Sequence, residues 1–254
     1  MSDHAGLPAR SAALDMLSGV LRRRRALHFE LDALTHLPAR DAGFARALAS
    51  QTLRHFGALE AVVASFLQKP LAPHKAGLAH EILLLGACEL LVLKGAAHAA
   101  VDAANNLAMK DSKARHFKPL VNAVLRNIAR NGADTLAKLD REKLSTPDWL
   151  WARWVSQYGE DTARAIAAAH LHEAPTDIVA KGECPESEPL FGRARRLAAP
   201  GRVDELPGFA EGHWWVQDAA ATLPVHLLGD VRGKAVIDLC AAPGGKTLQL
   251  AAAG

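Results

Sequence analysis

The stretch VIDLCAAPGGKT, residues 236–247, decides the fold of the last part of this chain. A short apolar run ends at the acid Asp238, a Pro-Gly-Gly turn follows, and the next residues fit the start of a helix. This order predicts a strand over 235–239, a loop whose backbone approaches a ligand, and a helix N-terminus. Folds that alternate strands and helices present nucleotide-like cofactors in this way.

The glycines of this loop indicate its chemistry. Gly244 and Gly245 carry no side chain, so the backbone there approaches a ligand closely, and Pro243 stiffens the turn. N–H groups at a helix start bind carboxylates and other polar groups. A Walker A loop is excluded because Cys240 stands in place of its first glycine, and no Gly-x-Gly-x-x-Gly pattern occurs. A tight turn without a ligand is the alternative.

Charge is distributed unevenly along the 254 residues. Residues 1–140 hold 18 Lys and Arg against 12 Asp and Glu, and residues 141–254 hold 12 against 15, which gives the net charge of +3. A basic first half suits a polyanionic partner such as RNA. Ordinary solubilising charge explains the same asymmetry equally well.

The cysteines and the apolar segments bound the class of protein. Cys88, Cys184 and Cys240 are widely separated and form neither a metal-binding pattern nor a disulfide framework. No apolar run reaches the about 20 residues that a membrane-spanning helix needs, and the N-terminus lacks the pattern of a signal peptide. We therefore expect a cytoplasmic protein with no metal and no membrane partner. We also expect a monomer.

Helical periodicity dominates residues 8–130, and no strand pattern occurs there. The segment 78–93 is apolar almost all round, with Glu81 and Glu89 among its few exceptions, which predicts a central buried helix ended by Gly95. We expect an all-α bundle of roughly six or seven helices.

Composition changes after residue 140, and the expected elements become shorter. Residues 182–212 are rich in Gly, Pro, Glu and Arg and predict either a small irregular α+β region or a connector. Around them we expect a helix from Pro147, a helix over 160–170, a strand over 177–181, a strand over 213–217, and a helix over 218–228 that Pro224 bends or shortens. Capping residues set several boundaries: Asp41, Thr146 and Asp218 as N-caps and Asn131-Gly132 as a helix end.

Several motifs together resemble one known family. Residues 238–247, DLCAAPGGKT, look like the first methyltransferase motif of the RNA cytosine-5 methyltransferases, and WVQD at 215–218 resembles the segment before it. AVDAA at 100–104 and FKPLVNAVLR at 117–126 resemble the RNA-binding fold of the antitermination factor NusB. PDWL at 147–150, with Arg153-Trp154 and Tyr158-Gly159, resembles the connector between the two parts. The order is similar to that of the RsmB (Sun/Fmu) family of bacterial 16S rRNA cytosine-5 methyltransferases.

This resemblance implies a multi-domain protein. It places an all-α NusB-like helical bundle at 1–140, a helical connector with a small irregular α+β region at 141–212, and the beginning of an α/β Rossmann-like class I methyltransferase domain at 213–254. The implied activity is S-adenosylmethionine-dependent methylation of cytosine C5 in 16S rRNA. A cysteine thiolate adds at C6, and C5 then attacks the sulfonium methyl group.

The resemblance also assigns the cofactor residues. S-adenosylmethionine is held mainly by backbone, at Cys240, Ala241, Ala242, Pro243, Gly244, Gly245 and Lys246. Cys240 is a loop residue in this assignment and not the nucleophile, because the family's two working cysteines lie in later motifs. The resemblance therefore gives this chain no catalytic residue, and we expect it not to methylate RNA alone. The chain is expected to be a truncated family member.

Cations on the helical part are the candidate contacts to RNA phosphates. They are Arg22, Arg23, Arg24, Arg25, Lys110, Lys113, Arg115, Lys118, Arg126 and Arg130. Arg126 and Arg130 lie four apart on one helical face, whereas the run 22–25 also suits a solvated helix end. The tryptophans of 149–154 are expected to pack the connector rather than stack on bases. A non-catalytic NusB-like RNA-binding or antitermination module is the alternative function.

Overall fold

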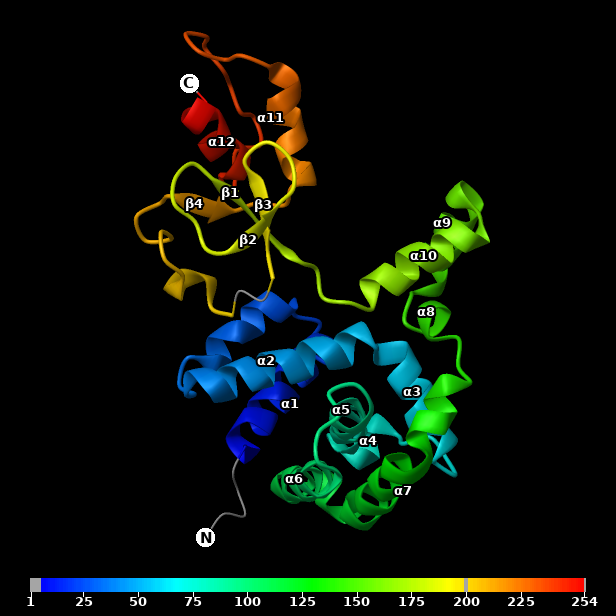
Figure 1. Cartoon of the computed structure of the whole chain (residues 1–254). Helices are drawn as coiled ribbons and strands as arrows, with labels where there is room; N and C mark the ends of the chain where they lie inside the picture. The colour runs from blue at the N-terminus through cyan, green and yellow to red at the C-terminus, as the bar shows by residue number, and fades with distance from the viewer. Residues whose placement is uncertain (1–5, 199–200, 254) are drawn as a thin grey trace. The chain divides into compact units, whose positions relative to one another are not determined.

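The computed structural model describes residues 6–198 and 201–253, and it is mostly helical (Figure 1). The chain divides into two compact units, Met1–His172 and Glu173–Gly254. The first unit is helical throughout its described part, as the periodicity predicts, and the second contains a small sheet. No helix among the described residues is long and apolar enough to cross a membrane.

The first unit is built from ten α-helices and two short 3₁₀ helices in its described part. The α-helices are α1 Leu7–Leu21, α2 Ala39–Arg54, α3 Phe56–Ser65, α4 Pro73–Ala76, α5 Ala79–Leu91, α6 Ala97–Lys110, α7 Lys118–Ala137, α8 Arg141–Leu144, α9 Asp148–Tyr158 and α10 Glu160–His170. The 3₁₀ helices are η1 Leu27–Leu34 and η2 Ala114–Phe117. The expected bundle is therefore present, and the helix expected over 160–170 has these bounds.

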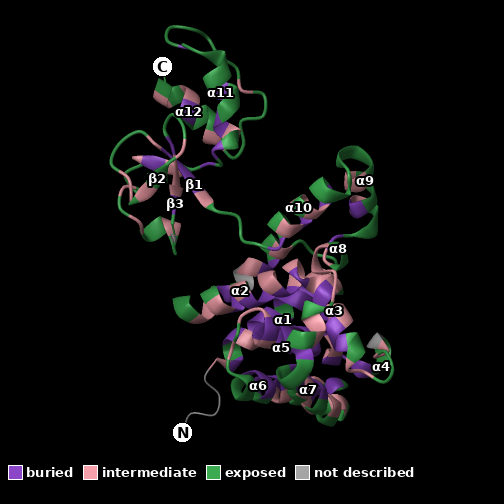
Figure 2. Ribbon diagram, turned by 45° about the vertical axis from the view of Figure 1, so that its right-hand side comes forward, coloured by how far each residue is buried: buried purple, intermediate pink, exposed green. Residues whose placement is uncertain are grey.

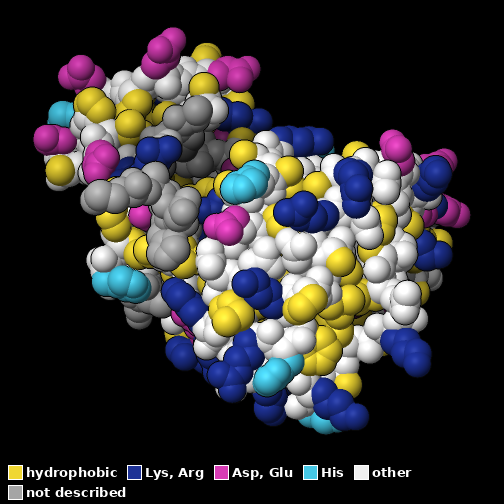
Figure 3. All heavy atoms as spheres, turned by 90° about the horizontal axis from the view of Figure 1, so that it is seen from below, with side chains coloured by type: hydrophobic (Ala, Val, Ile, Leu, Met, Phe, Trp, Pro, Cys, Tyr) yellow, Lys and Arg dark blue, Asp and Glu magenta, His cyan; other side chains and the backbone are white. Residues whose placement is uncertain are grey.

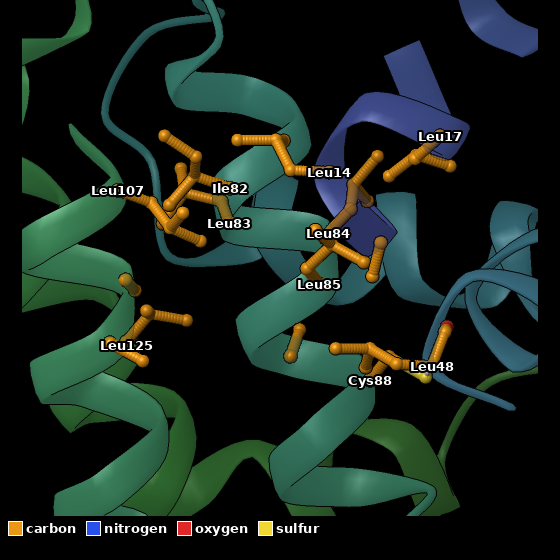
Figure 4. Close-up of a cluster of buried hydrophobic side chains, with 14 of the residues drawn as sticks. Leu14, Leu17, Leu48, Ile82, Leu83, Leu84, Leu85, Cys88, Leu107 and Leu125 are labelled. Atoms are coloured by element: carbon orange, nitrogen blue, oxygen red, sulfur yellow. Dashed lines mark hydrogen bonds between the residues drawn. The ribbon is translucent and has the colours of Figure 1, made fainter. Parts of the chain in front are cut away.

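Helix α5 is the central element of the helical bundle. Its apolar side chains lie between those of α1, α2, α6 and α7 (Figure 4), and the burial colours show the same core (Figure 2). Gly86 of α5 faces Leu125 of α7 so closely that a Cβ atom would lie 2.7 Å from the Leu125 methyl groups. A glycine here lets the two helices approach, and the almost continuous apolar surface of α5 is buried as its sequence predicts.

The two acidic residues of α5, Glu81 and Glu89, form buried ion pairs. The Arg10 guanidinium from α1 donates to both carboxylate oxygens of Glu89, with an Nε–Oε2 distance of 2.8 Å. Arg22, just after α1, donates to both oxygens of Glu81 and to the Gly77 carbonyl oxygen. Each carboxylate is almost fully buried, so each arginine compensates a charge that would otherwise be costly inside the bundle.

Several helix ends differ from the expected ones. The α2 N-cap is Pro38, and Asp41 lies in the first turn without capping it, since no side-chain cap bond forms there. The left-handed residue after α5 is Lys94, with φ of 55°, and not Gly95. Helix α7 continues through Asn131-Gly132 to Ala137, because Gly132 packs against Ile128 and Leu91 rather than ending the helix. Packing overrides the local stop signal at this position.

The N-cap of the first long helix after the bundle, α9, also differs from the expected one. Pro147 is the N-cap of α9, and the Thr146 hydroxyl donates back to the Glu142 carbonyl oxygen at 2.8 Å instead of capping. Trp151 is buried and faces the Arg164 guanidinium, which lies 5.4 Å from the ring centroid. Trp149 is 68% exposed, so it does not pack in the connector as expected.

The described part of the second unit contains an antiparallel sheet with the strand order β2-β3-β1-β4. Its strands are β1 Thr176–Ala180, β2 Ser187–Pro189, β3 Ala194–Leu197 and β4 Trp214–Val216. Ile178 pairs with Arg195 on one side and with Val216 on the other, and Ile178, Leu197 and Trp214 form the buried core. The expected strands over 177–181 and 213–217 are confirmed, and the irregular region between them supplies β2 and β3.

The remaining helices of this unit are η3 Val203–Glu205, η4 Ala220–Thr222, α11 Leu223–Leu228 and α12 Gly245–Ala253. The Asp218 carboxylate accepts from the Ala221 N–H at 3.2 Å, but the N-cap of η4 is Ala219, so Asp218 is not the cap residue that the sequence predicts. Pro224 lies in the first turn of α11 and not inside a longer helix. The proline therefore separates a 3₁₀ turn from an α-helix, which its missing N–H allows.

The strand expected over 235–239 is not formed. These residues belong to none of the strands of the described sheet, and Ile237 and Leu239 are 83% and 91% exposed. A parallel strand needs neighbouring strands and helices over both faces, and the described sheet is antiparallel and lies earlier in the chain. The prediction of a strand was therefore wrong for this structure, whereas the loop and the helix after it are present.

Candidate functional site

The loop 238–247 is held closed by Asp238. One carboxylate oxygen accepts from the Cys240 N–H at 3.1 Å, and the other accepts from the Thr247 hydroxyl at 2.7 Å. The acid that ends the apolar run therefore connects the start of the loop to the first turn of α12. This contact fixes the loop without a strand before it.

The backbone of the loop has two special features. The Ala242–Pro243 peptide bond is cis, and Gly244 has a φ of 116°, which side-chain-bearing residues rarely adopt. A Cβ atom at Gly244 would meet nothing within 4 Å, so the space beside this residue is open. At Gly245 a Cβ atom would lie 3.2 Å from the Gln217 side chain. Gly244 thus allows a backbone conformation that other residues rarely adopt, and Gly245 allows the loop to approach the Gln217 side chain closely.

Two glutamines anchor α12 to the segment after β4. The Gln217 amide donates to Gln249 Oε1 at 3.2 Å, and Gln249 Nε2 donates to the Thr222 carbonyl oxygen at 3.1 Å. Trp215 Nε1 donates to Gln217 Oε1 at 2.8 Å. The residues 215–218 and the loop 238–247, which the sequence singles out separately, are therefore parts of one hydrogen-bonded arrangement.

The predicted cofactor residues lie at the surface of this arrangement. Cys240, Ala241, Ala242, Pro243 and Lys246 are exposed, and Gly244 and Gly245 are half-buried. Helix geometry leaves the N–H groups in the first turn of α12 without intrahelical partners. The loop is therefore accessible at a helix N-terminus, but it borders no strand-end crevice within the described residues, since the expected strand is absent.

The basic run 22–25 is largely occupied by ion pairs. Arg22 binds Glu81, and Arg23 and Arg25 lie 3.2 Å and 3.1 Å from the Glu30 carboxylate. Arg24 has no ion-pair partner in the described part of the chain. Arg22, Arg23 and Arg25 therefore have a structural role in ion pairs. Arg24 is the residue of this run that is most available to contact RNA.

Two of the other predicted cations, Arg126 and Arg130, line a groove between α6 and α7. Its volume is about 390 Å³, and Arg126, Arg130, Asn105, Asn122, Asp102 and His98 contribute to its lining. Asn105 Nδ2 donates to Asn122 Oδ1 at 3.0 Å, whereas Asn105 Oδ1 is buried without a hydrogen-bond partner. Arg130 donates to Asn127 Oδ1 at 2.8 Å, which orients its guanidinium.

Further cations lie around the ends of these two helices. Lys110, Lys113, Arg115 and Lys118 are all exposed between the end of α6 and the start of α7. Lys113 also donates to the His74 carbonyl oxygen at 3.0 Å. Figure 3 shows Lys and Arg side chains gathered along one edge of the face that it displays. The structure thus brings six of the ten predicted cations to one pair of helices.

Sequence reasoning missed the polar residues inside the groove. Asn122 was part of the motif at 117–126, but its contact with Asn105 could not be read from either segment alone. Asn105 and Asn122 are 17 residues apart in sequence and meet because α6 packs against α7. Asparagines on the facing sides of two neighbouring helices would have been the sequence signal that predicts this polar contact.

The cysteines of the chain differ in environment. Cys88 is buried in α5, and burial raises the pKa of its thiol to about 11, so it is not a thiolate near neutral pH. Cys184 lies 3.8 Å from the Ser187 hydroxyl, and Cys240 is exposed. No group of three or more His, Cys, Asp and Glu side chains suited to a metal ion occurs among the described residues.

Residues 7–130 match the NusB family. The helical bundle of this chain is therefore a NusB family domain. Helices α1 to α6, most of α7 and the α6–α7 groove lie within the matched region, whereas the end of α7, α8 to α10 and the second unit lie beyond it. The motifs at 100–104 and 117–126 had indicated this family from the sequence.

The NusB domain is part of a longer likeness to curated proteins. The ribosomal RNA small subunit methyltransferase B of Pseudomonas putida is 34% identical over 265 residues, which is 95% of this chain and 59% of that protein. The protein of the same name from Pasteurella multocida is 31% identical over 261 residues, covering 96% and 58%. This chain is homologous to these proteins over nearly its whole length and spans about three fifths of theirs.

A solved structure shows a similar fold. The crystal structure of PH0851 has a TM-score of 0.63 to this chain at 17% sequence identity, and the match covers 97% of this chain and 60% of that one. At this identity the likeness concerns the fold alone. It extends over both the NusB domain and the second unit.

Proposed function

We propose that this chain is part of an S-adenosylmethionine-dependent methyltransferase that modifies cytosine C5 in 16S rRNA. In this proposal the chain binds RNA and forms the beginning of the cofactor site. The observation that carries the proposal is the homology to ribosomal RNA small subunit methyltransferases over 95% of the chain. The NusB domain supplies RNA contacts, and the second unit supplies the start of the cofactor site. The remaining two fifths of the relatives' length correspond to nothing in this chain.

The loop residues fit the methionine and ribose part of S-adenosylmethionine. Gly244 leaves open space, and the N–H groups that begin α12 are donors for a carboxylate. Cys240 to Lys246 would hold the cofactor through these backbone groups, while Asp238 keeps the loop closed. When bound, the cofactor supplies an electrophilic methyl group. The residues of this chain bind and orient it.

Cys88 and Cys240 are unsuited to attack on cytosine C6. Cys88 lies inside the NusB domain with its thiol pKa raised by burial. Cys240 belongs to the loop that would hold the cofactor, which leaves the nucleophile to another segment. We therefore propose that the chain alone binds RNA and cofactor without transferring the methyl group.

The α6–α7 groove is the proposed RNA contact. Arg126 and Arg130 provide the charge for phosphates, and the unpaired Asn105 Oδ1 is a buried acceptor for a base or ribose donor. A non-catalytic NusB-like module would use the same groove and would not require the loop at 238–247. The two functions therefore differ in cofactor binding.

Calorimetric titration with S-adenosylmethionine, together with a gel shift on a 16S rRNA fragment, tests the proposal. Gly244→Ala should abolish cofactor binding, because a side chain is strained at φ of 116°, and should leave RNA binding intact. Gly43→Ala, in α2 with open space around it, is the matched control. RNA binding with no cofactor binding by the unmodified chain would favour the module, and methyl transfer by the chain alone would contradict the assignment of its cysteines.

A further inference from the structure

The first compact unit, Met1–His172, contains another pocket, which has no lining residue in common with the α6–α7 groove. It has a volume of about 240 Å³ and lies between α3, α5, α7 and α8. Leu59, Leu91 and Leu136 contribute apolar walls, and the polar lining consists of His55, Lys94 and Arg141. Among the described residues that line it there is no Asp or Glu.

Arg141 enters this pocket because α8 packs tightly on α3. Gly57 near the start of α3 lies so close to the Leu144 carbonyl oxygen that no Cβ atom would fit there. The short helix α8 is thereby pressed onto α3, and its first residue, Arg141, joins the pocket lining. The Arg141 Nε atom is buried and donates no hydrogen bond. Buried guanidinium donors are normally satisfied, so this group lacks an acceptor.

His55 adds a second donor beside Arg141. Only 6% of the residue is exposed, and burial lowers the pKa of its imidazole. The nearby charges of Arg141, Arg54 and His172 lower this pKa further. Burial and the neighbouring cations therefore both disfavour the protonated form of the His55 imidazole.

Lys94 supplies the third donor from the end of α5. Its backbone has a φ of 55°, a left-handed conformation that is uncommon for a residue with a long side chain. Lys94 is exposed and is one of the residues that line the pocket. Three cationic or protonatable residues, just before α3, just after α5 and at the start of α8, thus line a pocket with apolar walls.

We propose that this pocket binds an oxyanion of the phosphate class between His55, Lys94 and Arg141. A tetrahedral oxyanion offers several acceptors to donors that arrive from different directions, and the planar arginine fork suits it well. The apolar walls reduce the competition from water and strengthen the contacts. The same chemistry comes from two sources, a free phosphate ion or a phosphodiester of bound RNA.

NMR of the His55 imidazole in the full chain gives a direct readout. Inorganic phosphate should shift the His55 ring resonances more than chloride of equal ionic strength does, and should raise the His55 pKa. Arg141→Gln should weaken phosphate binding by about tenfold, as expected for loss of one charge-assisted hydrogen bond. Lys94→Gln alters an exposed side chain without touching the packing of α8 and should also weaken binding. Arg153→Gln on the exposed face of α9 is the matched control.

A short oligoribonucleotide without terminal phosphates distinguishes the two sources. If it shifts His55 and phosphate competes with it, the occupant is a phosphodiester of RNA. If only inorganic phosphate shifts His55, the occupant is a free anion. No shift beyond that of chloride, or equal phosphate affinity in the unmodified chain and in both the Arg141 and Lys94 variants, overturns the proposal.

Discussion

The Gln217 side chain donates a hydrogen bond to Gln249 Oε1 across 3.2 Å, and this buried contact ties α12 to the segment after β4. Gln249 also donates to the Thr222 carbonyl oxygen. The helix that begins the proposed cofactor site is therefore held by side-chain amides. Its position depends on two residues that lie outside the loop itself.

Gln249→Leu should loosen α12. The substitution removes the acceptor of Gln217 and the donor to Thr222, and leaving buried polar groups unsatisfied costs about 1–3 kcal/mol. Hydrogen exchange of the α12 amides in the full chain measures the effect as faster exchange over 248–253. Leu248→Gln, at a half-exposed position of the same helix, is the control and should change little. Equal protection in the two variants would show that the glutamine pair is dispensable.

Arg22→Gln should destabilise the NusB domain more than Arg24→Gln does. Arg22 compensates the buried Glu81 carboxylate on the central helix, and breaking such a pair costs about 2–4 kcal/mol when one partner is partly exposed. Arg24 is exposed, and its loss should change the free energy of unfolding by less than about 0.5 kcal/mol.

Urea unfolding followed by circular dichroism compares these two arginine variants. The comparison also separates stability from RNA binding, since loss of RNA binding by the Arg22 variant at temperatures where it is folded would mean that this residue contacts RNA despite its ion pair. Equal midpoints for both variants would contradict the structural role of Arg22.

Arg126→Gln and Arg130→Gln should weaken RNA binding in a salt-dependent way. Each lost phosphate contact on single-stranded RNA lowers the slope of log K against log salt by about 0.7. Filter binding of a 16S rRNA fragment over a range of KCl concentrations gives these slopes. Arg153→Gln on α9 should keep the slope of the unmodified chain. An unchanged slope in both groove variants would place the RNA elsewhere.

Ile237→Ser and Leu239→Ser should be almost neutral for stability. Both side chains are more than four-fifths exposed and belong to no strand, so their replacement should change the free energy of unfolding by less than about 0.5 kcal/mol. A thermal melt of the full chain tests this directly. A loss of several degrees would mean that the segment 235–239 packs against other residues in solution.

The contrast between α5 and the segment 235–239 shows what the sequence predicts and what it does not. The apolar surface of α5 is buried by helices that lie within the same bundle, so periodicity alone predicts its place. Ile237 and Leu239 have the pattern of a buried strand, but a strand also needs partners, which no local pattern supplies. The loop at 238–247 and the basic residues of α6 and α7 were predictable as motifs. The Asn105–Asn122 contact and the pocket around Arg141 depend on helix packing, which the sequence does not state.

Asp177 should make the second unit sensitive to acid. Its buried carboxylate accepts from Arg196 at 2.8 Å and from the Ala219 N–H at 3.2 Å, and these contacts hold its pKa below the ordinary value of 3.8. Because the pKa is depressed in the folded state, the stabilisation is fully present above the unfolded pKa and is lost as the pH falls through the folded pKa. The loss should therefore begin below about pH 4.

The Asp177→Asn variant isolates this effect. The asparagine does not titrate, so the free energy of unfolding should be lower than that of the unmodified chain at pH 7, and the difference should shrink as the pH falls below 4. Tryptophan fluorescence reports on the unit through the buried Trp214. Asp204→Asn is the control, since that carboxylate also has a lowered pKa beside Arg202 but lies exposed, where its ion pair contributes little. If both variants lose the same free energy of unfolding at pH 7, burial of Asp177 does not make its ion pair more stabilising than an exposed one.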